Sequence, residues 1–171
     1  MEEPLVKIHY WLYPISWIYG MGVRLRNKLF DWGYYRSKSF DVPVVCVGNL
    51  AVGGTGKTPH TEYLIKLLQQ TGTNVAMLSR GYKRKSKGYV LATEETDVKR
   101  IGDEPYQIKT KFPAIRVAVD ENRCHGIEQL MKLDHPKVDV VLLDDAYQHR
   151  YVKADINILL IDYNRPIYDD H

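Results

Sequence analysis

Apolar positions follow two different patterns along the chain. Up to about residue 40 they recur at helical spacing among many aromatic residues, and from residue 41 short apolar runs alternate with segments of helical periodicity. Continuous apolar runs bounded by polar residues are typical of strands buried on both faces of a sheet. The alternation of such runs with helices predicts an α/β fold with a mostly parallel sheet flanked by helices.

The predicted strands are rich in Val, Ile and Leu. They cover residues 44–47, 75–78, 89–91, 115–119, 138–143 and 156–161. We expect the first strand and the last two to be buried. The last predicted strand has no helix after it to cover it, which favours a chain that is part of a longer protein, although N-terminal helices could also supply that cover.

Helices are predicted over residues 57–70, from near 103 toward 111, and over 122–133. In the first of these we expect one apolar side, formed by Tyr63, Leu64, Leu67 and Leu68. Residues 80–88 contain several basic residues and no helical periodicity, so we expect a basic loop there.

Residues 4–36 have an irregular helical pattern, with Pro14 as a break or a helix start. From Pro14 onward the spacing predicts an amphipathic helix with a basic side and aromatic flanks. Its apolar face is expected to contain Ile15, Ile18, Tyr19, Gly22, Leu29 and Phe30.

The charge of the chain is concentrated in the same N-terminal region. Lys and Arg number 24 against 21 Asp and Glu, a net charge of +3 that is too small to suggest a nucleic-acid binder. Residues 1–40 hold six of the basic residues and three of the acids, and they contain ten of the nineteen aromatic residues. We therefore treat residues 1–40 as a helical segment distinct from a domain over 41–171. It could contact a membrane, pack on the sheet or meet a further domain.

Two cysteines, Cys46 and Cys124, are too few for a disulfide framework or a Cys-rich metal site. Cys46 lies in an apolar run and is expected to be a buried thiol. No His, Cys or acid spacing predicts a zinc site. No apolar run reaches the roughly 18 residues of a membrane span, and no signal-peptide pattern occurs, so the body of the chain is expected to be cytoplasmic.

The strongest motif is a glycine-rich turn between the first predicted strand and the helix that follows it. Glycines allow backbone N–H groups to turn inward around phosphates, and the helix N-terminus adds further donors. Lys57 could reach the β- and γ-phosphates, and the Thr58 hydroxyl could bind Mg²⁺. The motif therefore predicts a P-loop that binds the phosphates of a nucleotide, with Ala51 where the strict pattern has Gly. Its phosphate-binding residues would be Ala51, Val52, Gly53, Gly54, Thr55, Gly56, Lys57 and Thr58.

A second signal is the apolar strand over 138–143, because it ends in two acids, Asp144 and Asp145. This is the Walker B pattern, in which a carboxylate lies near Mg²⁺ at the carboxyl end of a strand beside the P-loop. We expect Asp144 in the metal shell, directly or through water. Asp145 would share that role or orient the following loop.

Three further residues are candidates for binding phosphate or substrate. Arg80 follows a strand, where site residues of doubly wound sheets occur, and Arg123 lies near a helix start; either guanidinium could bind a phosphate oxygen. His149 follows the Walker B acids and could orient Asp145 or a substrate, or be structural. The other basic residues of the 80–88 loop are expected to be solvated or to meet anionic lipid headgroups. They are Lys83, Arg84, Lys85 and Lys87.

Several of these motifs occur together in one family. The segments that carry the resemblance are GNLAVGGTGKTP at 48–59, LSRGY at 78–82, GDEP at 102–105, Arg123, and LDDAYQHR at 143–150. Together they resemble the tetraacyldisaccharide 4′-kinase family, the lipid A 4′-kinases called LpxK, and span about residues 5–165. This chain has Ala146 and Tyr147 where the family usually has Gly and Phe. Family members are also roughly twice as long and carry a second domain.

The resemblance implies transfer of the γ-phosphate of ATP to the 4′-hydroxyl of tetraacyldisaccharide 1-phosphate, giving lipid IV-A. It also implies a peripheral enzyme at the cytoplasmic face of the bacterial inner membrane, with ATP and Mg²⁺ as cofactors. Asp103 matches the family's catalytic Asp and would accept the hydroxyl proton, although its position also suits a helix N-cap. Glu104 would belong to the site or complement the helix dipole.

Two other functional interpretations remain open. One is a P-loop GTPase or metallochaperone ATPase of related topology, although the chain has no guanine-reading Asn-Lys-x-Asp motif and no His/Cys cluster for metal delivery. The other is a nucleotide-binding fragment that is inactive alone because part of the site lies in a further domain.

Overall fold

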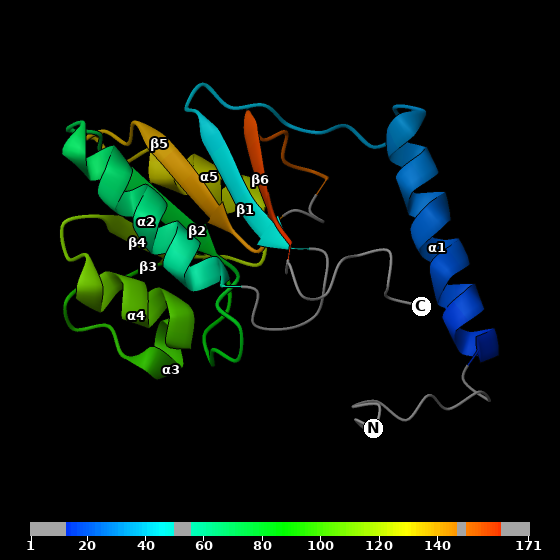
Figure 1. The fold of residues 1–171 in the computed structure, drawn as a ribbon, viewed down its shortest axis with the longest axis horizontal. Helices are drawn as coiled ribbons and strands as arrows, with labels where there is room; N and C mark the ends of the chain where they lie inside the picture. Colours follow the sequence, from blue (N-terminus) through cyan, green and yellow to red (C-terminus); the bar gives the residue numbers. More distant parts are fainter. Residues whose placement is uncertain (1–12, 50–55, 147–149, 162–171) are drawn as a thin grey trace. The chain divides into compact units, whose positions relative to one another are not determined.

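The computed structural model describes residues 13–49, 56–146 and 150–161 (Figure 1). The chain divides into two compact units, residues 1–37 and residues 38–171, and each is described by itself. Among the described helices, none combines the length and the apolar character that crossing a bilayer requires.

The described part of the first unit is mainly helix α1 (Tyr13–Asp31). Pro14 lies in its first turn, where a missing N–H group costs no helical hydrogen bond. The helix ends at Asp31, and Gly33, two residues later, has a φ of 74°, the left-handed conformation common after a helix C-terminus. Phe30 is buried and its ring lies 5.3 Å from that of Tyr35, whereas Tyr19, predicted on the same face, is exposed.

The second unit is built on one six-stranded sheet. Its strands are β1 (Val44–Asn49), β2 (Val75–Ser79), β3 (Val90–Leu91), β4 (Arg116–Val119), β5 (Val140–Asp144) and β6 (Ile156–Leu160). They are arranged in the order β3-β4-β2-β5-β1-β6, and every pairing is parallel except β3 with β4. The mostly parallel sheet that the apolar runs predicted is therefore confirmed, with an antiparallel strand at one edge.

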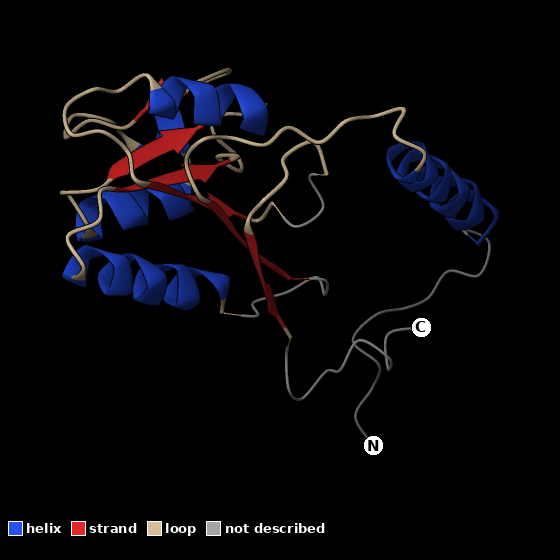
Figure 2. Cartoon of the chain, turned by 90° about the horizontal axis from the view of Figure 1, so that it is seen from above, coloured by secondary structure: helices blue, strands red, loops and turns tan. Residues whose placement is uncertain are grey.

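Helices cover both faces of this sheet. They are α2 (Lys57–Gln70), α3 (Val98–Ile101), α4 (Asp103–Lys111) and α5 (Arg123–Met131). Figures 1 and 2 show α2 and α4 on one face of the sheet and α5 on the other.

The core has two parts, one on each face. Residues of β1 alternate between them, as the period of two of a strand requires. Cys46 packs in the cluster with Ile127 and Leu130 of α5, whereas Val45 belongs to the cluster that contains Ile65 of α2. Cys46 is 2% exposed, so the predicted buried thiol is confirmed, and burial raises its pKa to about 11.

Three features differ from the predictions. In α2 the buried residues are Thr61 and Ile65. Of the predicted apolar side, Leu64 and Leu68 pack against the core, whereas Tyr63 and Leu67 are exposed, so the apolar face is rotated from the predicted one. The last strand, β6, was predicted to be buried but is an edge strand with an exposed Ile156. Helix α3 was missed, because four residues are too few to show helical periodicity.

Candidate active site

The carboxyl ends of four parallel strands, β1, β2, β4 and β5, bring polar residues to one edge of the sheet. Asn49 ends β1, Arg80 follows β2, Asp120 follows β4 and Asp144 ends β5. Ligands of open α/β sheets bind in the crevice outside these strand ends. The two strands that matter most are neighbours, because β1 pairs with β5 and Val47 is in register with Asp144.

Helix α2 begins directly at this edge. Gly56 precedes it with a φ of 77°, a left-handed conformation that glycine adopts without strain, and no side chain caps the helix. Lys57 and Thr58 occupy the first turn and are half-buried. The N-terminal N–H groups of this helix are therefore in the position in which P-loop helices bind phosphate. The candidate residues Ala51, Val52, Gly53, Gly54 and Thr55 lie outside the described residues.

Lys57 joins the P-loop helix to the ends of β1 and β5. Its Nζ lies 2.8 Å from Oδ1 of Asp145 and donates to Oδ1 of Asn49 at 3.1 Å. Asp145 has a φ of 51°, which is uncommon for a residue other than glycine and turns the chain sharply after β5. The structure thus brings together the lysine and one of the two acids that the motifs predicted separately.

Asp144 is 5% exposed, and no cation within the described ranges forms an ion pair with it. Burial, together with the negative charges of Glu104 and Asp145, raises the pKa of Asp144 to about 6, although the positive charges of Lys57 and Arg123 oppose the shift. The end of β5 therefore carries more negative charge than its surroundings balance. This excess suits a divalent cation.

Arg123, the first residue of α5, is 3% exposed. Its Nη1 donates to the backbone oxygen of Asp120, whereas Nε and Nη2 are buried and have no partner within the described residues. Burial lowers the pKa of the guanidinium, and the charge of Arg80 lowers it too, while Asp144 opposes the shift. Buried donors without partners are costly, so this side chain is suited to an anionic ligand.

Asp103 and Glu104 form the first turn of α4 and are both exposed. Asp103 lies inside the helix, and Gly102 is the N-cap, so the alternative of Asp103 as the cap residue is not what the structure shows. Glu104 is close enough to affect Asp144 through its charge. Arg80 is exposed, and His149 lies outside the described residues.

Three features of this edge were not singled out from the sequence. Asn49 contacts Lys57, which could have been suspected from its place at the end of the P-loop strand. Asp120 is buried and its Oδ2 lies 2.6 Å from Nδ1 of His125. Arg84, which was expected to be solvated or to meet lipid headgroups, has a side chain only 3% exposed.

The sequence model of the tetraacyldisaccharide-1-P 4′-kinase family, LpxK, matches residues 8–171. The chain belongs to this family. The tetraacyldisaccharide 4′-kinase of Bacteroides fragilis strain YCH46 is 69% identical over 170 residues, and that of Porphyromonas gingivalis strain W83 is 54% identical over 172 residues. These alignments cover 99% and 100% of this chain but 45% and 47% of the relatives, so the chain spans about half their length.

The fold is also that of an LpxK structure. The crystal structure of LpxK from Aquifex aeolicus in complex with ATP is 41% identical in sequence and superposes with a TM-score of 0.79. The match covers 90% of this chain and 49% of the Aquifex chain. The resemblance to LpxK and the P-loop kinase fold predicted from the motifs are both confirmed.

Proposed function

We propose that residues 41–171 are the ATP-binding domain of a lipid A disaccharide kinase. The reaction would transfer the γ-phosphate of ATP to the 4′-hydroxyl of tetraacyldisaccharide 1-phosphate and give lipid IV-A. The observation that carries this proposal is the contact of Lys57, at the start of α2, with Asp145, which directly follows β5. Family membership and the Aquifex LpxK–ATP structure support it.

In this proposal Lys57 and the first turn of α2 bind the phosphates of ATP together with residues 51–55. Lys57 exchanges its contact with Asp145 for a phosphate oxygen, as the P-loop lysine of an NTPase does. Arg123 and Arg80 provide guanidinium donors for phosphate oxygens of the nucleotide or the lipid. His149 and Glu104 are further candidates for contact with the substrate.

Asp103 is the proposed general base. The 4′-oxygen forms a bond to the γ-phosphorus, the bond from that phosphorus to the bridging oxygen breaks, and ADP leaves with the electron pair. The hydroxyl proton passes to the Asp103 carboxylate, because a sugar hydroxyl is too weak an acid to ionise unaided. Its exposed position at the start of α4 leaves Asp103 open to a second substrate.

The residues present fit Mg²⁺, which prefers oxygen ligands and keeps several water molecules and phosphate oxygens in its shell. The Thr58 hydroxyl and the carboxylates of Asp144 and Asp145 would hold it. The observation that favours this is the buried carboxylate of Asp144, which has no ion-pair partner among the described residues. When bound, Mg²⁺ would neutralise charge on the phosphates.

The N-terminal segment, residues 1–40, is proposed to contact the membrane surface. Helix α1 exposes Trp17 and Tyr19, and Trp32 follows it, also exposed, while the region carries the chain's excess of basic charge. Exposed tryptophans beside basic residues are typical of interfacial segments. A substrate with four acyl chains is retained in the bilayer, so a peripheral enzyme at the cytoplasmic face of the inner membrane is the arrangement we propose.

The test is an assay of the full-length protein with ATP, Mg²⁺ and tetraacyldisaccharide 1-phosphate. Wild-type protein is expected to form the 4′-phosphorylated lipid, and Lys57→Ala to lower kcat by about 100-fold or more, because phosphoryl transfer depends on electrostatic stabilisation. Asp103→Ala is expected to lower kcat by about 10²- to 10⁴-fold while ATP still binds. Equal turnover of Asp103→Ala and wild type would contradict the base assignment.

Two rival readings have distinct outcomes in the same assay. Preference for GTP without lipid phosphorylation would favour the GTPase or metallochaperone reading. Nucleotide binding without turnover by residues 1–171, with turnover by the full-length protein, would show that the site is completed by the rest of the protein.

A further inference from the structure

Arg84 lies in the basic loop after β2, yet its side chain is only 3% exposed. The neighbouring Lys83, Lys85 and Lys87 are exposed, as expected for a solvated loop. Burying an arginine is costly, and pairing its charge offsets part of that cost. Arg84 therefore has a different task from the lysines around it.

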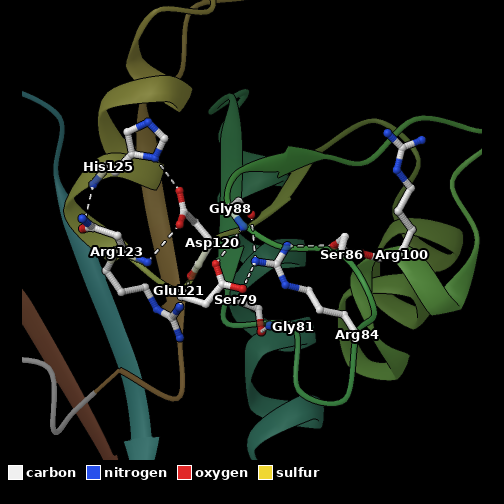
Figure 3. Close-up of polar contacts among 11 residues, drawn as sticks. Ser79, Gly81, Arg84, Ser86, Gly88, Arg100, Asp120, Glu121, Arg123 and His125 are labelled. Atoms are coloured by element: carbon white, nitrogen blue, oxygen red, sulfur yellow. Dashed lines mark hydrogen bonds and ion pairs between the residues drawn. The ribbon is translucent and has the colours of Figure 1, made fainter.

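The guanidinium of Arg84 links two loops. Its Nη2 lies 2.7 Å from Oε1 of Glu121, which follows β4, and donates to the backbone oxygen of Gly88 at 2.7 Å. Its Nη1 donates to Oγ of Ser86 at 3.2 Å. Oε2 of Glu121 accepts from the N–H of Gly88 at 2.9 Å, which closes the network shown in Figure 3.

Glu121 is held as a carboxylate by this network. Partial burial would raise the pKa of Glu121, but hydrogen bonds from its own backbone, from Arg84 and from Gly88 outweigh that effect and lower it. Arg84 and Glu121 thus form a charged pair, and the charge of both partners strengthens their hydrogen bonds.

The same loop lies against the segment that leads into α4. The N–H of Lys85 donates to the backbone oxygen of Lys99 at 2.8 Å, and the Ser86 hydroxyl donates to the backbone oxygen of Arg100. A Cβ on Gly81 would lie 2.8 Å from the oxygen of Ile101, and 2.5 Å from Cδ of Arg84. Backbone therefore touches backbone along this contact, with no room for a side chain.

The contact ends one residue before the proposed base. Gly102 has a φ of 92°, and a Cβ on it would lie 2.8 Å from the backbone oxygen of Tyr82. Asp103 follows as the first residue of α4. The backbone conformation of Gly102, which orients Asp103, thus depends on its contact with the 81–88 loop, and Arg84 stabilises that loop.

We propose that Arg84 is a positioning residue for phosphoryl transfer. By pairing with Glu121 and closing the 81–88 loop, it fixes the Gly102–Asp103 junction relative to the start of α5, where Arg123 lies. This rests on the proposed function, because it assigns Arg84 to the placement of that reaction's base. Glu121 lies two residues before Arg123, so the pair couples the start of α4 to the start of α5.

The test uses the full-length enzyme with Arg84→Gln, Arg84→Lys and a matched control, Arg100→Gln. Arg100 is exposed, and Figure 3 shows its guanidinium directed away from the network. Arg84→Gln is expected to lower kcat by about 10- to 100-fold, because small misplacement of a reacting group costs that much. The KM for ATP should stay within about twofold, since the P-loop is untouched. Arg84→Lys should be intermediate, because Lys keeps the charge but lacks the planar fork.

A double-mutant cycle separates positioning from general loss of structure. In the Asp103→Ala background, Arg84→Gln should cause no further loss of kcat, because the group that it places is gone. Glu121→Gln, which breaks the pair from its half-exposed side, should reproduce part of the kcat loss even if Arg84→Gln folds poorly. An undiminished loss in the Asp103→Ala background, or unchanged kcat in Arg84→Gln and Glu121→Gln, would overturn the proposal.

A second measurement does not depend on activity. Amide hydrogen exchange over residues 99–106 should become faster in Arg84→Gln than in wild type and stay unchanged in Arg100→Gln. If wild-type enzyme fails to phosphorylate the lipid, the proposed function is wrong, and exchange alone decides whether Arg84 orders this junction. Unchanged exchange in Arg84→Gln would overturn the inference even in an active enzyme.

Discussion

Folding buries the carboxylate of Asp144 and thereby disfavours its ionised form. It is 5% exposed at the end of β5, and Glu104 and Asp145 add negative charge around it. Its pKa is about 6 instead of the usual 3.8, so ionisation opposes folding. The folded state loses stability from this group as the pH rises from about 4 to about 6, and the cost at neutral pH is on the order of 3 kcal/mol.

Asp144→Asn should therefore make the metal-free protein more stable at pH 7.5 while it lowers phosphoryl transfer. An amide keeps the shape but carries no charge to desolvate, so a rise of Tm by several degrees is expected. At pH 4, where the wild-type carboxylate is protonated, the two proteins should melt alike. Thermal melts at both pH values check this, and a lower Tm of Asp144→Asn at pH 7.5 would contradict it.

Individual residues could be predicted where the signal was local. Lys57 and Asp144 were chosen as candidates because strand, loop and helix patterns lie next to them in the sequence. Arg84 could not be found in this way, because its burial depends on Glu121, which a separate strand brings to it. Basic loops are usually solvated, and only the fold shows which of their charges has a partner.

Helix α5 approaches the sheet unusually closely at Gly126. A Cβ there would lie 2.7 Å from Cδ2 of Leu78 in β2 and 3.1 Å from Cβ of Asp120. Leu78 is fully buried, so its side chain has little freedom to move away. The position that carries Arg123 thus depends on a glycine within its own helix.

Gly126→Ala should lower the free energy of unfolding. Alanine gains about 1 kcal/mol in helix propensity, but overpacking a core costs about 1–3 kcal/mol, so a net loss on the order of 1 kcal/mol is expected. Gly22→Ala in α1 is the control, because a Cβ there meets nothing within 4 Å. Denaturant titration of both variants measures the free energy of unfolding. A Gly126→Ala variant that is more stable than wild type would show that the Leu78 side chain moves to make room for the added methyl group.

Strands with strong apolar runs were predicted well. Elements whose burial depends on residues far away in the sequence were predicted less well. The runs at β1, β2 and β5 have all their residues buried. For α2 the apolar side was misjudged, because leucines recur on two sides of the helix and only the sheet selects Ile65. An equally apolar run gave β6, but its place at the sheet edge depends on strand order, which periodicity does not encode.

At the scale of the molecule, the chain divides into two compact units, residues 1–37 and residues 38–171. Among the described residues, both parts of the sheet's core are formed within the second unit. The sequence suggested this division, because the charge and aromatic composition change near residue 40. The sequence did not decide what the N-terminal segment contacts, because exposed aromatic residues suit both a membrane surface and a protein interface.

Deleting residues 1–37 from the full-length protein should weaken membrane binding and leave the second unit folded. Co-sedimentation with vesicles containing anionic lipid should fall by about tenfold or more, because interfacial binding scales with buried apolar area and basic charge. The melting transition of the second unit should shift by only a few degrees. Undiminished co-sedimentation of the deleted protein would place membrane contact elsewhere in the protein.

The division into units also separates the chain's fluorophores. Trp11, Trp17 and Trp32 all lie within residues 1–37, and residues 38–171 contain no tryptophan. Indole emission from this chain therefore comes from the N-terminal unit alone, and Trp17 and Trp32 are exposed to solvent in it. Excited selectively, they act as a built-in optical reporter, whose blue shift would register transfer of α1 from water to lipid without labelling or interference from the nucleotide-binding core.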